Sequence, residues 1–132
     1  MDFSPQLEGC CVSKKILLCI DDEATGLKIR KTILERNGYA VLTAPDGAEG
    51  LALFEREKVN AVIVDFYMPG MDGGKVASEM KRRKPTVPIV LLSAYYSLPD
   101  GATDAVDAFI TKGDSPEVLL NKISELVQSN PT

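Results

Sequence analysis

Short apolar runs alternate along this chain with longer segments of helical periodicity. Five runs, each a candidate strand, cover residues 15–20, 40–44, 61–65, 89–93 and 108–111. A continuous apolar run of this length is typical of a strand buried on both faces. The segments between the runs predict helices at 24–37, after Asp46, after Asp72 and from Pro116, with a weaker helix within 98–106.

Capping residues indicate where these helices begin and end. Asp46 with Glu49 predicts a capping box, and Asp72 predicts an N-cap. Ser115 is an N-cap candidate before Pro116 at the first helical position, and a glycine at 38 ends the first helix. The positions expected to face the sheet are Ile29 and Ile33, then Ala48, Leu51 and Phe54, then Val76 and Met80, then Leu119, Ile123 and Leu126.

Five strand–helix units predict a single α/β domain with a parallel five-stranded sheet covered on both faces. Because crossovers between parallel strands are right-handed, the expected fold is a doubly wound (βα)5 domain. We expect the strand order 2-1-3-4-5, counted along the chain. In that order the first and third strands are neighbours, and ligands bind at their carboxyl ends.

Composition excludes several classes of function. The chain has 132 residues and a formal net charge of −4, which argues against direct binding of nucleic acid. The basic run at 81–84 is interpreted as a solvated helix end rather than a phosphate contact. No segment predicts a membrane span or a signal peptide, so a cytoplasmic protein without membrane contact is expected. The three cysteines lack metal-ligand spacing, and the absence of histidine excludes histidine-based acid–base catalysis.

Polar residues follow four of the five predicted strands. Asp21 and Asp22 come after the first strand, and Asp65 ends the third. Ser93 ends the fourth strand, and Lys112 follows the fifth. Since the carboxyl ends of parallel strands lie at one edge of the sheet, these five side chains are expected to lie along one rim.

Three neighbouring carboxylates repel one another, and they stay ionised together only with a cation among them. Oxygen ligands without histidine or cysteine suit Mg²⁺. An ionised aspartate in line with a phosphoryl donor is a nucleophile that forms an acyl phosphate, while Mg²⁺ and a lysine stabilise the charge on the transferred group. The rim therefore predicts a phosphoryl-accepting site.

The motifs Asp21-Asp22-Glu23, Asp65-x-x-Met68-Pro69-Gly70-Met71-Asp72-Gly73, Ser93-Ala94 and Phe109-x-x-Lys112 occur together in this chain. In this respect it resembles a response-regulator receiver domain of two-component signalling, similar to the chemotaxis regulators and flavodoxin-like in fold. The resemblance implies a receiver domain over 14–129, flanked by an N-terminal tail of residues 1–13 and a C-terminal tail of residues 130–132.

The resemblance also implies roles at the acidic rim. Asp65 would accept a phosphoryl group from a histidine kinase or a histidine phosphotransfer protein. Asp22, Asp65 and the backbone carbonyl of Tyr67 would bind Mg²⁺ directly, with Asp21 in support largely through water.

Three further residues would act on the phosphoryl group or respond to it. By the same resemblance, Lys112 would contact the phosphoryl group, and Ser93 would be the switch hydroxyl. Phe109 would be the aromatic residue that reports the switch, although plain core packing explains it equally well. The output would pass through binding of an unknown downstream protein.

The chain departs from the family pattern in three places. The family usually has a cis proline after the lysine, whereas this chain has Gly113, for which we expect a trans bond. Asp114 stands where an apolar residue is common. The stretch between the fourth and fifth strands is about one helical turn shorter than usual, so its helix should be short, with Pro99 in its first turn and Gly101 within it.

Two other functions remain open. A phosphatase of the haloacid-dehalogenase type also uses a strand-end aspartate, Mg²⁺ and a lysine. That class usually has a second acid two residues after the nucleophile, where this chain has Tyr67, and it carries a cap insertion that is missing here. A receiver fold serving only as a docking module is the other alternative. We expect a switch that acts only on its own aspartyl phosphate and is not otherwise an enzyme.

Overall fold

The computed structural model describes residues 14–95 and 97–129. Its five strands are β2 (Ile16–Ile20), β3 (Ala40–Ala44), β4 (Ala61–Asp65), β5 (Ile89–Ser93) and β6 (Ala108–Thr111). They form one parallel sheet in the order β3-β2-β4-β5-β6, which is 2-1-3-4-5 counted along the chain. The predicted sheet is confirmed. The two predicted tails, 1–13 and 130–132, lie outside the described residues.

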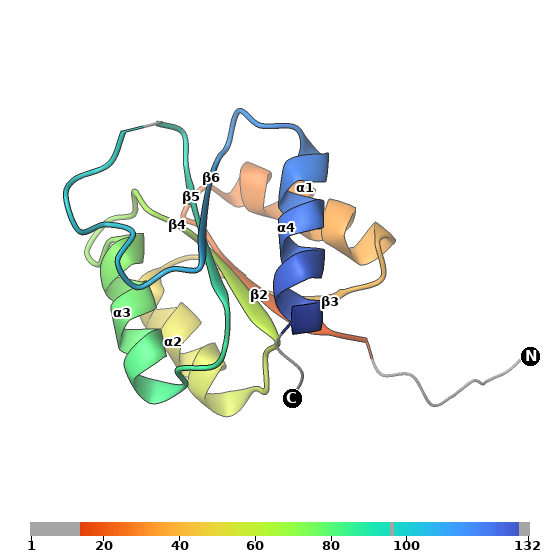
Figure 1. Cartoon of the computed structure of the whole chain (residues 1–132), viewed down its shortest axis with the longest axis horizontal. Helices are drawn as coiled ribbons and strands as arrows, with labels where there is room; N and C mark the ends of the chain where they lie inside the picture. Colours follow the sequence, from red (N-terminus) through yellow and green to blue (C-terminus); the bar gives the residue numbers. More distant parts are fainter. Residues whose placement is uncertain (1–13, 96, 130–132) are drawn as a thin grey trace, which may run out of the picture.

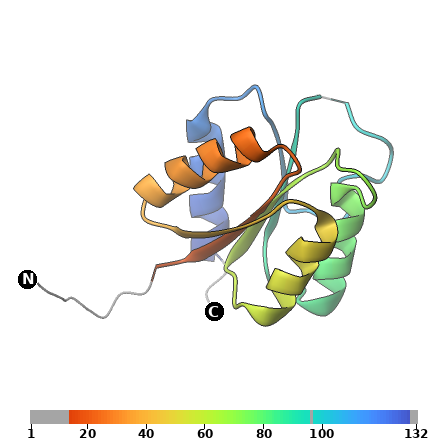
Figure 2. The same ribbon diagram turned by 180° about the vertical axis from the view of Figure 1, so that it is seen from behind.

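Four helices cover the sheet, namely α1 (Ala24–Arg36), α2 (Gly47–Arg56), α3 (Gly73–Arg83) and α4 (Pro116–Ser129). Helices α2 and α3 lie on one face, and α1 and α4 lie on the other (Figures 1 and 2). None of the helices in the described part of the chain is long and apolar enough to cross a membrane.

Each face of the sheet has its own hydrophobic core, because successive side chains of a strand point to opposite faces. Leu18, Val62 and Val64 pack with Phe54 and Met80 on the side of α2 and α3. Leu17, Cys19 and Ile63 pack with Leu34 and Ile123 on the side of α1 and α4. Because both faces of the strands are covered, the strands are mostly apolar, with polar residues such as Asp65 and Ser93 at their carboxyl ends.

The predicted N-caps Asp46 and Asp72 and the helix-ending glycine are confirmed, as are most of the predicted inward positions; the Glu49 half of the capping box and the Ser115 N-cap stay predictions. Asp46 accepts a hydrogen bond from the Glu49 N–H at 2.9 Å, and Asp72 accepts one from Lys75 at the same distance. Gly38 has φ of 95°. All described peptide bonds are trans, as expected after Lys112.

Two predicted core positions are wrong. Ile29 is 56% exposed, and Ala48 is exposed as well. Helix α1 instead buries Leu27 and Leu34, which are two turns apart and form the stripe that faces the sheet. Both stripes fit helical periodicity, so the sequence pattern alone did not distinguish them.

The helix predicted within 98–106 is also wrong. This segment consists of successive turns, in which the N–H groups of Ala102, Asp104 and Val106 donate to carbonyls three residues earlier. Pro99 lacks an N–H, and Gly101 has φ of 83°, which breaks helical geometry. The described residues therefore form four helices rather than the five expected.

The turn segment packs beside α3, as both ribbon views show (Figures 1 and 2). Leu98, Ala102 and Val106 contact the core on that side. At its end, Asp107 accepts hydrogen bonds at 2.7 Å from the Ile89 N–H and from Lys81 Nζ. The segment thus covers the sheet with irregular backbone where a fifth helix was expected.

Candidate functional site

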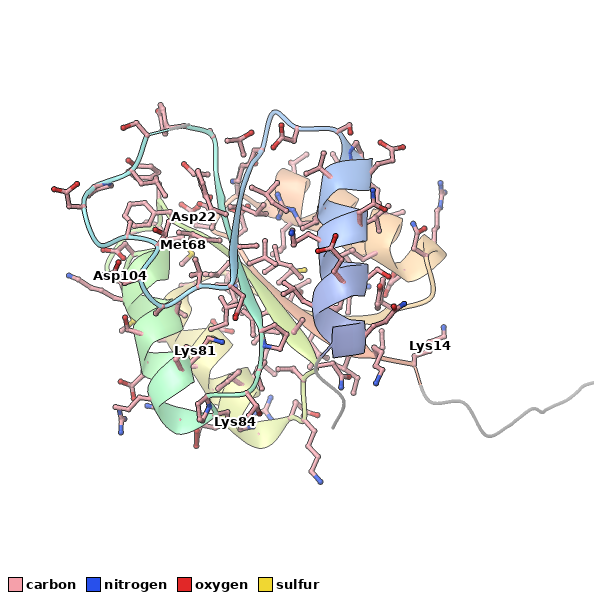
Figure 3. All side chains as sticks on the ribbon, viewed as in Figure 1. Lys14, Asp22, Met68, Lys81, Lys84 and Asp104 are labelled. Atoms are coloured by element: carbon pink, nitrogen blue, oxygen red, sulfur yellow. The ribbon has the colours of Figure 1, made fainter. Side chains whose placement is uncertain are left out.

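Three carboxylates gather at the carboxyl ends of β2 and β4, which are neighbours in the sheet. Asp21, Asp22 and Asp65 each offer one oxygen, and these oxygens lie within 4.8 Å of one another. Asp21 and Asp65 are buried, whereas Asp22 is exposed. Figure 3 labels Asp22 at this end of the sheet. The clustering predicted from the strand ends is therefore present.

Backbone contacts hold the acidic loops in place. The Asp21 N–H donates to the Ala44 carbonyl at 3.2 Å, and the Gly73 N–H donates to the Phe66 carbonyl at 2.9 Å. A Cβ added at Gly73 would lie 2.4 Å from the Asp65 carbonyl oxygen. Only glycine allows α3 to begin this close to Asp65.

Lys112 joins two of the three carboxylates. Its Nζ lies 2.9 Å from Asp21 Oδ2 and 3.0 Å from Asp65 Oδ1. The Lys112 N–H donates to the Ser93 carbonyl at 2.7 Å, which fixes the end of β6 against β5. The predicted lysine thus reaches the acidic cluster across the sheet edge.

A second cation, Arg30 of α1, also reaches the cluster. Its Nη1 lies 3.3 Å from Asp21 Oδ2, while Asp21 Oδ1 accepts the Glu23 N–H at 3.0 Å. Sequence reasoning missed Arg30. The sequence offered only a weak signal, which was the place of Arg30 in the first helix after the acidic pair, one turn beyond Gly26.

The two buried carboxylates have different electrostatic surroundings. Burial alone would raise the pKa of Asp21, but the Glu23 N–H, Lys112 and Arg30 together hold that pKa below its usual value. Burial raises the pKa of Asp65, and although Lys112 opposes this effect, the nearby Asp21 charge adds to it. Burial tends to lower the pKa of Lys112, but hydrogen bonds to Asp21 and Asp65 raise it above its usual value.

Ser93 ends β5, the strand beside Asp65, and Phe109 lies on β6 opposite Leu91. Ser93 is fully buried, and its Oγ accepts a hydrogen bond from the Tyr95 N–H at 3.0 Å. Phe109 is partly buried and packs against the core beside α3. Both residues are placed as packing requires, and their switch roles stay predictions.

Tyr67 and Tyr95 form an exposed aromatic pair two residues beyond Asp65 and Ser93. Their ring centroids are 5.3 Å apart in an edge-to-face arrangement, and the side chains are 46% and 61% exposed. Tyr67 also contacts Phe66 edge to face at 4.7 Å. The pair therefore presents two large rings to solvent beside the loops that carry the site.

The basic run belongs to the far end of α3, as expected for a helix terminus. Figure 3 shows Lys81 and Lys84 on that part of the helix, away from Asp22. Lys84 donates to the Phe54 carbonyl at 2.6 Å and so caps α2, while Arg82 and Arg83 both pair with Glu79. These contacts support the structural interpretation of the run.

The residues present fit a magnesium ion. The cluster offers hard carboxylate oxygens without nitrogen or sulfur ligands, and the exposed Asp22 leaves room for bound water. Mg²⁺ prefers such a site, with few carboxylates and several retained waters.

The family model for the response regulator receiver domain matches residues 17–124. The chain therefore belongs to the response regulator receiver domain family, as its motifs indicated.

Three relatives illustrate the similarity. The transcriptional regulatory protein GlrR of Escherichia coli is 39% identical over 119 residues, which are 87% of this chain but only 27% of GlrR. A CheY-like receiver domain from Methanospirillum hungatei superposes with a TM-score of 0.84 at 32% identity, covering 89% of this chain and 97% of that one. The response regulator TrrA of Thermotoga maritima, solved in complex with Mg²⁺-BeF, gives 0.82 at 34% identity, covering 85% and 98%. TrrA has also been solved in complex with the histidine kinase ThkA.

Proposed function

We propose that this domain is a signalling switch whose Asp65 accepts a phosphoryl group. The observation that carries the proposal is the position of Asp65 at the mouth of the central strand. One of its oxygens lies 3.0 Å from Lys112, and one lies within 4.8 Å of oxygens from Asp21 and Asp22. A nucleophile, a cation and a metal-ligand set thus converge on one point.

In this reaction an ionised oxygen of Asp65 attacks the phosphorus of a phosphohistidine on the donor. The new oxygen–phosphorus bond forms as the nitrogen–phosphorus bond breaks, and the electron pair of that bond returns to the imidazole. The acceptor itself needs no histidine, which fits a chain that has none. Mg²⁺, when bound, neutralises charge on the phosphoryl oxygens.

The chain's own residues complete the site. Asp22 and Asp65, with the Tyr67 carbonyl, would hold the metal, and Asp21 would support it. Lys112, which lies between Asp21 and Asp65, would contact the oxygens of the phosphoryl group. Ser93 turns its hydroxyl toward the transferred group, and Phe109 responds by moving toward the space that Ser93 leaves.

The proposed phosphoryl donor is a histidine kinase or a histidine phosphotransfer protein in the cytoplasm. The complex of TrrA with ThkA supports a kinase partner. We propose that this 132-residue chain passes the signal to a downstream protein. Its net charge of −4 makes nucleic acid or an anionic membrane a poor partner. GlrR is a transcriptional regulatory protein, and the chain spans about a quarter of its length. DNA binding in a longer regulator would therefore belong to another segment.

Intact-mass spectrometry after incubation with acetyl phosphate and Mg²⁺ tests the proposal. The wild type should gain one phosphoryl group, and Asp65→Asn should gain none. Asp72→Asn is the matched control, because asparagine still caps α3 and the nearby acid is outside the proposed site. A full gain in Asp65→Asn would rule out Asp65 as the acceptor.

One further measurement separates the switch from the phosphatase, and another tests the metal site. Sustained hydrolysis of a phosphomonoester by the wild type, abolished in Asp65→Asn, would favour the phosphatase over a switch phosphorylated once. Calorimetric titration of Mg²⁺ should show much weaker binding to Asp22→Ala, because few charged oxygens would remain. Unchanged Mg²⁺ affinity in Asp22→Ala would remove that residue from the metal site.

A further inference from the structure

Arg30 is a cation of the site to which neither the motifs nor the family match assigns a role. Its guanidinium contacts Asp21 Oδ2 at 3.3 Å. The Arg30 side chain is only 14% exposed, and that of Asp21 is fully buried. A pair this well shielded from water interacts more strongly than a surface ion pair.

Arg30 shares its acceptor atom with Lys112. Lys112 Nζ lies 2.9 Å from the same Asp21 oxygen and 3.0 Å from Asp65 Oδ1. Asp21 therefore contacts two cations, Arg30 and Lys112, whereas Asp65 contacts only Lys112. Three carboxylates face two cations, so the metal-free site has a net charge of −1 when all five groups are ionised.

A phosphoryl group on Asp65 brings new anionic oxygens close to Lys112. The new phosphoryl oxygens would compete with Asp21 for the Lys112 ammonium, which lies 2.9 Å from Asp21 Oδ2. A buried carboxylate that loses its cation is strongly disfavoured unless another partner stays. Arg30 and the Glu23 N–H are the partners that can stay on Asp21, because neither contacts Asp65 in the described structure.

We propose that Arg30 is a positioning residue that holds the charge of Asp21 and so frees Lys112 for the phosphoryl group. This inference rests on the proposed phosphoryl-acceptor function. Without Arg30, Lys112 becomes the only side-chain cation on Asp21 and is drawn away from Asp65.

The proposal predicts effects of opposite sign when Arg30 is replaced by Met, which keeps an apolar stem of similar length. Phosphorylation by acetyl phosphate should slow by about tenfold or more, the scale of one charge-assisted hydrogen bond. Affinity for Mg²⁺ in the absence of phosphodonor should rise, since a nearby positive charge is gone. If Arg30 were purely structural, its loss would distort the site and lower both the phosphorylation rate and the affinity for Mg²⁺.

The experiment measures both quantities in Arg30→Met, Arg30→Lys and Lys28→Met. Lys28→Met is the matched control, since it removes an exposed cation from the same helix and should change neither quantity by more than about twofold. Arg30→Lys should restore part of the phosphorylation rate by restoring the charge. A rate within about twofold of the wild type in Arg30→Met, or a fall in both quantities, would overturn the proposal.

A double-mutant cycle tests whether Arg30 acts through Lys112. In the Lys112→Met background, the further change Arg30→Met should have little effect on the residual phosphorylation rate, because no lysine is left to release. An undiminished effect in that background would overturn the proposed route. If the wild type itself takes up no phosphoryl group, the proposed function fails. If the wild type is phosphorylated but Arg30→Met matches it, only the role of Arg30 fails.

Discussion

Replacing Lys112 by Met should destabilise the metal-free domain. Lys112 bridges Asp21 and Asp65, whose side chains are 0% and 6% exposed, while its own side chain is 25% exposed. Met preserves the apolar stem and removes only the charge. Asp21 keeps Arg30 and the Glu23 N–H, so Asp65 is the carboxylate left without a cation.

The expected loss lies between two limits. Breaking a fully buried ion pair by removing one partner costs about 3–5 kcal/mol, and an exposed pair contributes about 0–1 kcal/mol. Because Lys112 is a quarter exposed and only one carboxylate is orphaned, we expect a loss of about 2 kcal/mol near pH 7.

The loss of stability in Lys112→Met should depend on pH, and the pKa of Asp65 determines the direction of that dependence. Burial already raises the pKa of Asp65, and Lys112 opposes that rise. Without Lys112 the folded-state pKa rises further above the unfolded value. A carboxyl whose pKa is raised in the folded state costs stability above that pKa, and the cost disappears as the pH falls toward the unfolded value. The difference between wild type and variant should therefore shrink as the pH is lowered from 7 toward 4.

Urea unfolding followed by circular dichroism, with a chelator present, measures both effects. Lys122→Met serves as a control, because its pair with Glu125 is exposed and should change stability by less than about 0.5 kcal/mol. Added Mg²⁺ should stabilise Lys112→Met more than the wild type, since the more negative site binds the ion more tightly. A variant as stable as the wild type near pH 7, or a gap that widens in acid, would refute the reasoning.

Other predictions concern the surroundings of the site. If Tyr67 and Tyr95, which pair edge to face, border the path of attacking water as the receiver-domain pattern implies, loss of the phosphoryl group should be slow and Tyr67→Asn should speed it about tenfold; unchanged hydrolysis rates in both Tyr67→Asn and Tyr95→Ala would contradict this. Gly73→Ala should cost about 1–3 kcal/mol in urea unfolding and slow phosphorylation, because its Cβ would meet the Asp65 carbonyl; wild-type values for both would remove the packing argument. Burial raises the pKa of Cys19 to about 12, so native protein at pH 8 should leave the tryptic peptide 16–28 unalkylated, and rapid alkylation there would contradict its burial.

The strands were the part of the fold most accessible from the sequence. A fully buried parallel strand is a continuous apolar run, and β3, β4, β5 and β6 begin and end where those runs do. The rotation of α1 was less accessible, because Ile29 and Leu27 both belong to apolar stripes of helical spacing. Only packing against β2 and β3 decides between them.

The helix expected within 98–106, which the structure replaces by turns, could not be judged from the sequence for a different reason. The sequence between β5 and β6 contains Pro99 and Gly101 and is short, which weakens a helix but does not exclude one. Gly101 takes φ of 83°, outside helical geometry, while Leu98, Ala102 and Val106 still pack against the core from the turns. The expectation of a fifth helix came from the repeating strand–helix pattern, and local residues outweighed it.

The acidic cluster was predictable because parallel strands end at one edge, which brings Asp21, Asp22 and Asp65 together whatever the details of packing. Arg30 was not, because it comes from the middle of a helix, and its reach depends on how α1 lies over β2. Residues that complete a site from a helix face leave a weaker signal than residues at strand ends.

The position of the phosphoryl group is the most direct test of the central claim. After reaction with acetyl phosphate and Mg²⁺, borohydride reduces an aspartyl phosphate to homoserine, which tandem mass spectrometry can locate. The tryptic peptide 59–75 contains both Asp65 and Asp72. Homoserine at 65, with unmodified Asp72 and no homoserine at Asp21 or Asp22, is the predicted result. Homoserine at any other aspartate, with Asp65 intact, would contradict the account.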